Sequence, residues 1–212
     1  MVTPQSLPDL YLASASPRRR ELLVQIGLRV EVVPQSVSEQ WLDGESPEDY
    51  VQRLAVEKAQ AGFSTLSQDR QRPVLGADTA VVLDDPVQGP IILGKPADEA
   101  AALAMLAQLS GRTHRVLSAL AVVGKDNLGQ DRVAVGMNQS RVSFREINEE
   151  ERRAYWRTGE PADKAGSYGI QGKGALFVER IEGSYSGVMG LPLFETGELL
   201  RQFGIEVLLG RP

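Results

Sequence analysis

Hydrophobic positions along the 212-residue chain alternate from the start between strand-like runs and helix-like spacing. Residues 10–13 (LYLA) form a short apolar run that predicts a buried strand. Ser16 and Pro17 then precede an apolar helical face, which predicts a helix that is capped at Ser16 and ends at Gly27. Residues 29–34 predict a second strand after that helix.

The tetrapeptide SPED repeats this start signal, with Ser46 as the expected cap and Asp49 at the capping-box position. It predicts a helix that runs to about Gly62. The segment 74–83 is almost entirely apolar and predicts a buried strand, and a polar turn then leads into a second apolar run. Residues 74–94 are therefore expected to form a β-hairpin.

The rest of the chain follows the same rules. Further elements are expected at 98–109 (helix), 114–124 and 132–144 (strands), 148–159 (helix opened by a capping box), 175–181 (strand) and 193–203 (helix). Strands and helices alternate at first and strands then cluster, which indicates an α/β fold with a mixed sheet. No stretch has the composition of a linker, so we expect one domain with at most two lobes.

Composition and charge narrow the classes of function. The chain has no cysteine, which excludes disulfides, a thiolate nucleophile and cysteine metal sites. It shows no signal-peptide pattern and no apolar run long enough to cross a bilayer, which predicts a cytoplasmic protein without a membrane partner. The formal net charge of −5 argues against binding to nucleic acid, whereas a small anionic ligand needs only a few focused cations.

Three arginines crowd the start of the first predicted helix, in the segment LASASPRRRELL. A helix N-terminus carries partial positive charge, so cations are unfavourable there unless an anion is bound. Ser14 and Ser16 add hydroxyl donors, and Arg18 and Arg19 can hold a phosphate through paired N–H groups. The alternative is that the arginines simply point into solvent.

Two charged residues stand where apolar residues are expected. Lys58 belongs to the apolar stripe of the second predicted helix, so its ammonium either reaches solvent past the core or points into a polar cleft. Asp78 lies within an apolar strand, on a face shared with Gly76 and Ala80, and these small residues are expected to leave open space above its carboxylate. Because a buried charge needs a partner, Asp78 is a candidate general base or metal ligand; the alternative is a structural aspartate bonded to backbone amides.

The segment EPADKAGSYGIQGKG at 160–174 combines Asp163, Lys164 and Gln171 with four glycines. Glycines let a backbone approach a ligand closely, so this segment is a candidate binding loop; an ordinary flexible loop is the alternative. The single histidine, His114, begins a predicted strand without an adjacent nucleophile, and we interpret it as structural.

These residues together suit the attack of water on a polyphosphate. Asp78 supplies a carboxylate, and the arginine cluster and isolated lysines supply phosphate-binding cations. Glu39, in the polar segment SVSEQ, is a second carboxylate that can hold a divalent metal such as Mg²⁺ or Mn²⁺. The residues alone therefore predict a phosphate-handling hydrolase.

Ordered segments over roughly residues 10–203 resemble the Maf-type nucleoside triphosphate pyrophosphatases. These segments are LASASPRRRELL, RLAVEKA, VLGADTAVV, GKP at 94–96, LSGRTHRV, and GEPADKAGSYGIQGKGALFVERIEGSY followed by VMGLPL. The resemblance implies an elongated mixed β-sheet with flanking helices and two lobes around a cleft, similar to inosine-triphosphate pyrophosphatases. It implies a single Maf-like domain over 10–212, preceded by a flexible tail over 1–9, in a family that is often homodimeric.

The resemblance also implies a reaction. Such proteins hydrolyse nucleoside triphosphates to the monophosphate and diphosphate and need a divalent metal. Asp78 corresponds to the proposed proton acceptor and, with Glu39, to the metal site, although Ser38 stands where many relatives carry a further acidic residue. The residues that correspond to the family's substrate-binding positions are Ser14, Ser16, Arg18, Arg19, Lys58, Lys95 and Lys164.

Three specificity positions resemble the branch of the family that acts on dTTP and UTP. They are Arg18, Thr79 and Gln171, where the branch acting on 7-methylguanosine triphosphate typically carries Trp, Gln and Glu. The expected substrates are therefore dTTP and UTP, together with modified pyrimidine triphosphates. Two alternatives stay open: the same chemistry on 7-methylguanosine or other modified purine triphosphates, and a non-enzymatic, partner-binding role linked to cell division.

Overall fold

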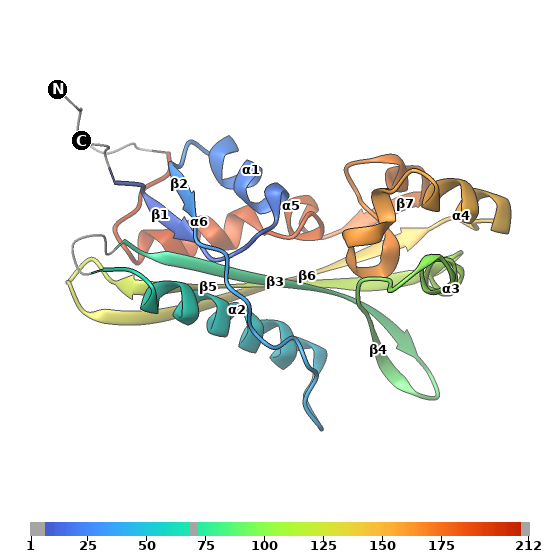
Figure 1. Ribbon diagram of the computed structural model, residues 1–212, viewed down its shortest axis with the longest axis horizontal. Coiled ribbons are helices and arrows are strands. Elements are labelled where there is room, and N and C mark those ends of the chain that lie inside the picture. The colour runs from blue at the N-terminus through green and yellow to red at the C-terminus, as the bar shows by residue number, and fades with distance from the viewer. Residues whose placement is uncertain (1–6, 68–71, 209–212) are drawn as a thin grey trace.

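The structure, a computed structural model, describes residues 7–67 and 72–208. Within these residues the chain forms a seven-stranded sheet with the order β2–β1–β3–β5–β6–β7, and β4 pairs with β3 off this path (Figure 1). The strand β1 pairs in parallel with both β2 and β3, whereas β3–β4, β3–β5, β5–β6 and β6–β7 are antiparallel. The predicted α/β fold with a mixed sheet is confirmed.

The elements lie close to their predicted positions. The strands are β1 (Leu10–Leu12), β2 (Val30–Val32), β3 (Val74–Asp85), β4 (Gly89–Leu93), β5 (Thr113–Lys125), β6 (Asp131–Phe144) and β7 (Val178–Glu182). The helices are α1 (Pro17–Gln25), α2 (Pro47–Ser64), α3 (Glu99–Leu109), α4 (Glu149–Trp156), α5 (Tyr185–Val188) and α6 (Leu193–Arg201). The strand predicted at 175–181 begins only at Val178, because residues 173–177 form a 3₁₀ turn.

Two apolar cores share one face of the long strand β3. Leu75 and Ala77 pack into a core with α1 and α6, whereas Val81 and Leu83 pack into a second core with α3 and α4. Figure 1 shows these helix pairs at opposite ends of an elongated molecule. Thr79 points from the same face between the two cores, so the predicted pair of lobes around a cleft is confirmed.

Helix α2 covers the opposite face of β3, and it comes unusually close at Gly76. A Cβ atom at Gly76 would lie 2.3 Å from the Ala55 carbonyl oxygen and 2.5 Å from the Ala59 amide nitrogen. The expectation that Gly76 leaves open space beside Asp78 is therefore wrong, because the helix backbone fills it. Glycine allows this approach, and the approach brings Lys58 of α2 beside Asp78.

The start of the described chain is joined to the sheet. The carboxylate of Asp9 binds the guanidinium of Arg29 at 2.8 Å, just before β2. Residues 1–6 of the predicted tail lie outside the described residues, and the predicted domain boundaries stay a prediction. Among the described residues, no helix is both long enough and apolar enough to cross a membrane.

Candidate functional site

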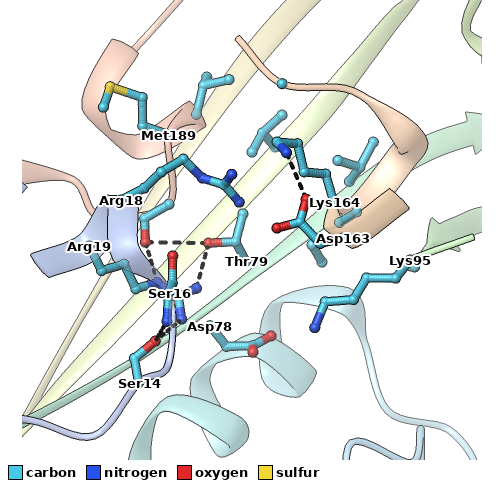
Figure 2. A pocket seen from close by; sticks show the side chains of 18 of the residues that line it. Ser14, Ser16, Arg18, Arg19, Asp78, Thr79, Lys95, Asp163, Lys164 and Met189 are labelled. Atoms are coloured by element: carbon cyan, nitrogen blue, oxygen red, sulfur yellow. Dashed lines mark hydrogen bonds and ion pairs between the residues drawn. The ribbon is translucent and has the colours of Figure 1, made fainter. Parts of the chain in front are cut away.

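The predicted site residues all line one cavity of about 630 Å³ between the two lobes. They are Ser14, Ser16, Arg18, Arg19, Glu39, Lys58, Asp78, Thr79, Lys95, Lys164 and Gln171. Figure 2 shows Arg18, Lys95 and Lys164 reaching toward the same space from three different segments. The fold therefore collects cations from distant parts of the chain around one hollow.

The arginines at the start of α1 do not share one environment. Arg20 is exposed, whereas Arg18 is half-buried and directs its guanidinium into the cavity without a hydrogen bond to any residue that the structure describes (Figure 2). Ser16 is the N-cap, but its hydroxyl makes no capping bond. The start of α1 thus presents a guanidinium, Arg18, and a hydroxyl, Ser16, that are both available to a ligand.

Arg19 is instead bound to the protein. Its Nε donates to the Gly190 carbonyl oxygen at 2.9 Å, and its Nη1 donates to Ser14 Oγ at 3.0 Å and to the Ala77 carbonyl oxygen at 2.8 Å. Its Nη2 donates to Thr79 Oγ1 at 3.1 Å. These bonds occupy most of the five N–H donors of a guanidinium, so Arg19 ties α1, β3 and the segment after α5 together. Its role as a phosphate ligand stays a prediction.

A single ammonium joins the two predicted acidic residues. Lys58 Nζ lies 2.7 Å from Asp78 Oδ1 and 2.7 Å from Glu39 Oε1. The side chains of Lys58 and Asp78 are almost fully buried, whereas half of the Glu39 side chain is exposed. Lys58 therefore points into a polar cleft, one of the two alternatives for its place on the apolar stripe.

Burial and ion pairing oppose each other at these carboxylates. Burial raises the pKa of Asp78 above its ordinary value, although the charges of Lys58 and Arg19 act in the opposite direction. At Glu39, partial burial also favours the protonated form, but the hydrogen bond and charge of Lys58 outweigh it and lower the pKa. Asp78 is thus a stronger base than an ordinary aspartate, which suits a group that accepts a proton, whereas Glu39 is held in its ionised form.

Two further lysines frame the cavity on the side of the second lobe. Lys95 follows β4 and extends toward the cavity, where its charge contributes to the lowered pKa of Glu39 (Figure 2). Lys164 Nζ donates to Asp163 Oδ1 and to the Glu160 carbonyl oxygen, both at 2.6 Å. Lys95 is therefore an exposed cation available to a ligand, whereas Lys164 is already held in place.

The glycines of the predicted binding loop meet protein atoms. A Cβ at Gly172 would lie 2.3 Å from Glu160 Oε2, and a Cβ at Gly174 would lie 2.6 Å from the Tyr155 hydroxyl oxygen. The loop therefore packs around an internal carboxylate, a contact that its sequence pattern did not predict. Gln171, at the tip between these glycines, is exposed and lines the cavity.

Tyr50 is a cavity residue that the sequence analysis missed. Its hydroxyl donates to the Glu39 carbonyl oxygen at 3.0 Å, which holds the irregular segment of Glu39 against α2. Burial and the nearby charges of Asp78 and Glu39 raise the pKa of Tyr50 to about 12. The sequence does not predict this contact, because Glu39 belongs to an irregular segment whose hydrophobic pattern does not place it relative to α2.

The donor set at Glu39 and Asp78 fits a divalent metal together with a substrate. Among the described residues, no group of three His, Cys, Asp or Glu side chains can hold an ion alone. Mg²⁺ typically binds one or two protein carboxylates and completes its shell with phosphate oxygens and water. Each of these carboxylates keeps one oxygen that is not bonded to Lys58, so the pair suits such a shared site.

The family model described as Maf-like protein matches residues 9–203 of the chain. The chain belongs to the Maf family. The dTTP/UTP pyrophosphatase of Alkalilimnicola ehrlichii is 51% identical to this Maf protein over 206 residues, which cover 96% of each chain. The dTTP/UTP pyrophosphatase of Saccharophagus degradans is 52% identical over 200 residues, which cover 94% of this chain and 90% of its own. The resemblance found in the sequence is confirmed.

A solved structure from Mycobacterium abscessus, named nucleoside-triphosphatase / dITP/XTP pyrophosphatase, is also similar to this Maf protein. It is 24% identical, and the alignment covers 65% of this chain and 74% of its own with a TM-score of 0.37. A TM-score this low carries no argument about the site. The fold assignment therefore rests on the family match and on the sheet itself.

The single histidine of this Maf protein is buried, as its structural interpretation requires. His114 Nε2 lies 2.9 Å from the Tyr168 hydroxyl oxygen, and Nδ1 has no hydrogen-bond partner among the described residues. Burial lowers the pKa of His114 from 6.5 to about 4. Between these two pH values His114 is therefore protonated in the unfolded chain and neutral in the folded chain.

We expect the free energy of unfolding to decrease as the pH falls below 6.5, the ordinary pKa of His114, and to be fully restored above it. Protonation of His114 in the unfolded chain is expected to lower the free energy of unfolding by about 2 kcal/mol between pH 7 and pH 5. Urea unfolding of the wild type and of His114→Gln at both pH values measures it, since glutamine stays neutral. An equal loss of stability in both proteins would contradict the assignment.

Proposed function

We propose that this Maf protein hydrolyses dTTP and UTP to the nucleoside monophosphate and diphosphate. The observation that carries the proposal is a buried carboxylate, Asp78, in a cavity surrounded by cations from separate segments. Relatives named dTTP/UTP pyrophosphatase, about half identical over nearly the whole chain, support the same substrates. A nucleotide is also compatible with the acidic chain, because a small anionic ligand needs only a few focused cations.

The triphosphate is held by the cations at the rim and floor of the cavity. Arg18 and Lys95 have no ion-pair partner among the described residues, and their charges are therefore available to phosphate oxygens. Lys164, fixed by Asp163 and the Glu160 carbonyl, adds a third positive charge at a set position. Because Arg18, Lys95 and Lys164 belong to three separate segments around the cavity, they suit an extended triphosphate better than a single phosphate group.

Asp78 is the proton acceptor for the attacking water. Lys58 holds this carboxylate in the cavity through Oδ1, and the carboxylate takes the proton as the water oxygen attacks the α-phosphorus. The bond from the α-phosphorus to the bridging oxygen breaks, and diphosphate leaves with the electron pair. The pKa of Asp78, which burial raises, makes the carboxylate a stronger base than an exposed aspartate.

Glu39 and Asp78 are the residues that would hold a divalent metal with the bound triphosphate. Mg²⁺ or Mn²⁺ there supplies neutralisation of the charge that develops on the diphosphate. Lys58 keeps the two carboxylates next to each other, and the hydroxyl of Tyr50 fixes the backbone of Glu39. The two carboxylates are thus held close together by the protein's own residues.

Base selectivity is assigned to Gln171, Thr79 and Arg18, which all line the cavity. The side-chain amide of Gln171 offers two donors and one acceptor, which match the alternating groups on a pyrimidine edge. Thr79 Oγ1 accepts a hydrogen bond from Arg19 and forms another with Ser118 Oγ at 2.9 Å, so Thr79 acts by shaping the floor of the cavity. A purine, with a larger ring system, requires a different arrangement of these groups.

Gln171→Glu is expected to lower the turnover of dTTP by at least about tenfold, because the carboxylate loses both amide donors. The melting temperature should change little, because Gln171 is exposed. Diphosphate release is measured for dTTP, UTP, dCTP, inosine triphosphate and 7-methylguanosine triphosphate, each with Mg²⁺ and with Mn²⁺. Unchanged dTTP turnover would remove Gln171 from the specificity site.

The same nucleotide panel separates the remaining alternatives. A preference of the wild type for 7-methylguanosine triphosphate over dTTP would replace the proposed substrates. No diphosphate from any triphosphate would instead favour a partner-binding protein. The homodimer and the cytoplasmic location stay predictions.

A further inference from the structure

The exposed side chain of Gln171 has no hydrogen bond to the residues that the structure describes, so only the backbone of the loop limits the positions that its amide can reach. The chain runs through this position in a loop without strand or helix pairing. Something outside the loop must hold it if Gln171 is to distinguish one base from another. Two polar side chains, from α4 and from the 3₁₀ turn at Glu160–Asp163, meet this requirement.

Glu160 holds the side of the loop that follows Gln171. Its Oε2 accepts a hydrogen bond from the Lys173 amide at 2.8 Å, and its Oε1 accepts one from the Gly174 amide at 3.1 Å. Burial favours protonation of this carboxyl, but the Tyr155 hydroxyl and these two amides outweigh it and lower the pKa of Glu160. An ionised carboxylate bound by two consecutive amides is a strong local anchor.

Tyr155 holds the side that precedes Gln171. Its hydroxyl accepts a hydrogen bond from the Gly169 amide at 3.0 Å and donates to Glu160 Oε1 at 2.6 Å. Its ring packs edge-on against Phe177 with a centroid distance of 5.1 Å. The two anchors are therefore joined to each other and to the core of the second lobe.

We propose that Glu160 and Tyr155 are positioning residues that set base selectivity by clamping the segment of Gln171 from both sides. This inference rests on the proposed function, in which Gln171 is the residue that distinguishes one base from another. The clamp also explains why residue 172 is a glycine, because a Cβ there would lie 2.3 Å from Glu160 Oε2. Through its carbonyl oxygen, which accepts from Lys164, Glu160 also links the base end of the cavity to a phosphate-binding lysine.

The substitution Glu160→Gln removes one part of the clamp while keeping its size. An amide cannot accept from both the Lys173 and Gly174 amides and also from the Tyr155 hydroxyl, because its NH₂ group only donates. Tyr155→Phe removes one hydroxyl and leaves the ring against Phe177. The control is Glu149→Gln, in the first turn of α4, where the carboxylate pairs with Arg153 at the surface.

We expect the ratio of kcat/KM for dTTP to that for inosine triphosphate to fall about tenfold in Glu160→Gln and less in Tyr155→Phe. Most of the fall should come from a higher KM for dTTP. In a Gln171→Ala background, Glu160→Gln should leave the ratio unchanged, because it acts through Gln171. The control variant keeps the wild-type ratio. A purely structural role would instead lower the rates for both nucleotides equally.

The outcomes separate this inference from the proposed function. If Gln171→Ala changes the ratio but Glu160→Gln and Tyr155→Phe do not, the clamp is overturned and the proposed substrates stand. If Gln171→Ala leaves the ratio unchanged, both the clamp's effect on selectivity and the assignment of Gln171 fall. Hydrogen exchange at the Gly169, Lys173 and Gly174 amides, measured without nucleotide, tests the clamp directly. Faster exchange in Glu160→Gln supports it, and unchanged exchange overturns it.

Discussion

Replacing Asp78 by asparagine is expected to slow the release of diphosphate from dTTP by about 10²–10⁴-fold, the usual contribution of a general base. The amide has nearly the size of the carboxylate but cannot take a proton from water. Lys58 keeps its second partner, because Glu39 Oε1 remains 2.7 Å from its ammonium. The fold should therefore persist, which circular dichroism and the melting temperature measure alongside the rate.

Asp84→Asn is the matched control for this variant. Asp84 lies on the same strand, pairs with Arg115 at 2.7 Å and is largely exposed, outside the cavity. It should retain the rate of the wild type. A rate for Asp78→Asn close to that of the control, in a folded protein, would show that Asp78 is not the proton acceptor.

Lys58→Met should lower kcat/KM for dTTP by about 10²–10³-fold near neutral pH, since it removes a buried charge from the centre of the site. Lys58 opposes the effect of burial on Asp78, while the charge of Glu39 acts with burial. Without the ammonium, the pKa of Asp78 rises further, so the carboxylate is protonated at pH values where the wild type is ionised. The acid limb of the pH profile of kcat/KM should move to higher pH.

Measurement of kcat/KM across the acidic and neutral range distinguishes this effect from a general loss of fold. Lys125→Met is the control, because Lys125 pairs with Asp131 at the surface and lies outside the cavity. An acid limb at the same pH in Lys58→Met and the wild type would mean that Lys58 does not determine the charge of Asp78.

Local signals in the sequence predicted most of the fold. At α2, Ser46 caps the helix by accepting from the Asp49 amide, and at α4 the capping box of Asn148 and Glu151 forms as expected. These signals act within four residues, so they can be recognised without knowledge of the tertiary structure. The same holds for the long apolar strand β3.

The pairing of site residues could not be predicted in this way. Lys58 and Asp78 each place a charge where an apolar residue is expected, but the sequence does not indicate that the two side chains form an ion pair with each other. Their contact depends on how close α2 comes to β3; the sequence pattern indicates open space at Gly76, where the structure places the backbone of α2. A glycine within a strand indicates a close approach but does not identify what approaches.

The hydrogen-bond partners of Arg19 could not be predicted from the local sequence either. The sequence placed it at a helix start, where an unbalanced cation indicates a bound anion. In the structure its donors meet the carbonyl oxygens of Ala77 and Gly190, which are 58 and 171 positions away along the chain. Acceptors that distant leave no trace in the local pattern, whereas Arg18, with no such partner among the described residues, keeps the expected role open.

The bond from Arg19 to Gly190 also bears on how the protein is made. Chains grow from the N-terminus, and their first segments begin to fold while synthesis continues. Arg19 leaves the ribosome early, but its acceptor at Gly190 is translated 171 residues later. The hydrogen bonds of Arg19 can therefore be completed only after Gly190 has been made, and a nascent or truncated chain that lacks Gly190 cannot form all of them.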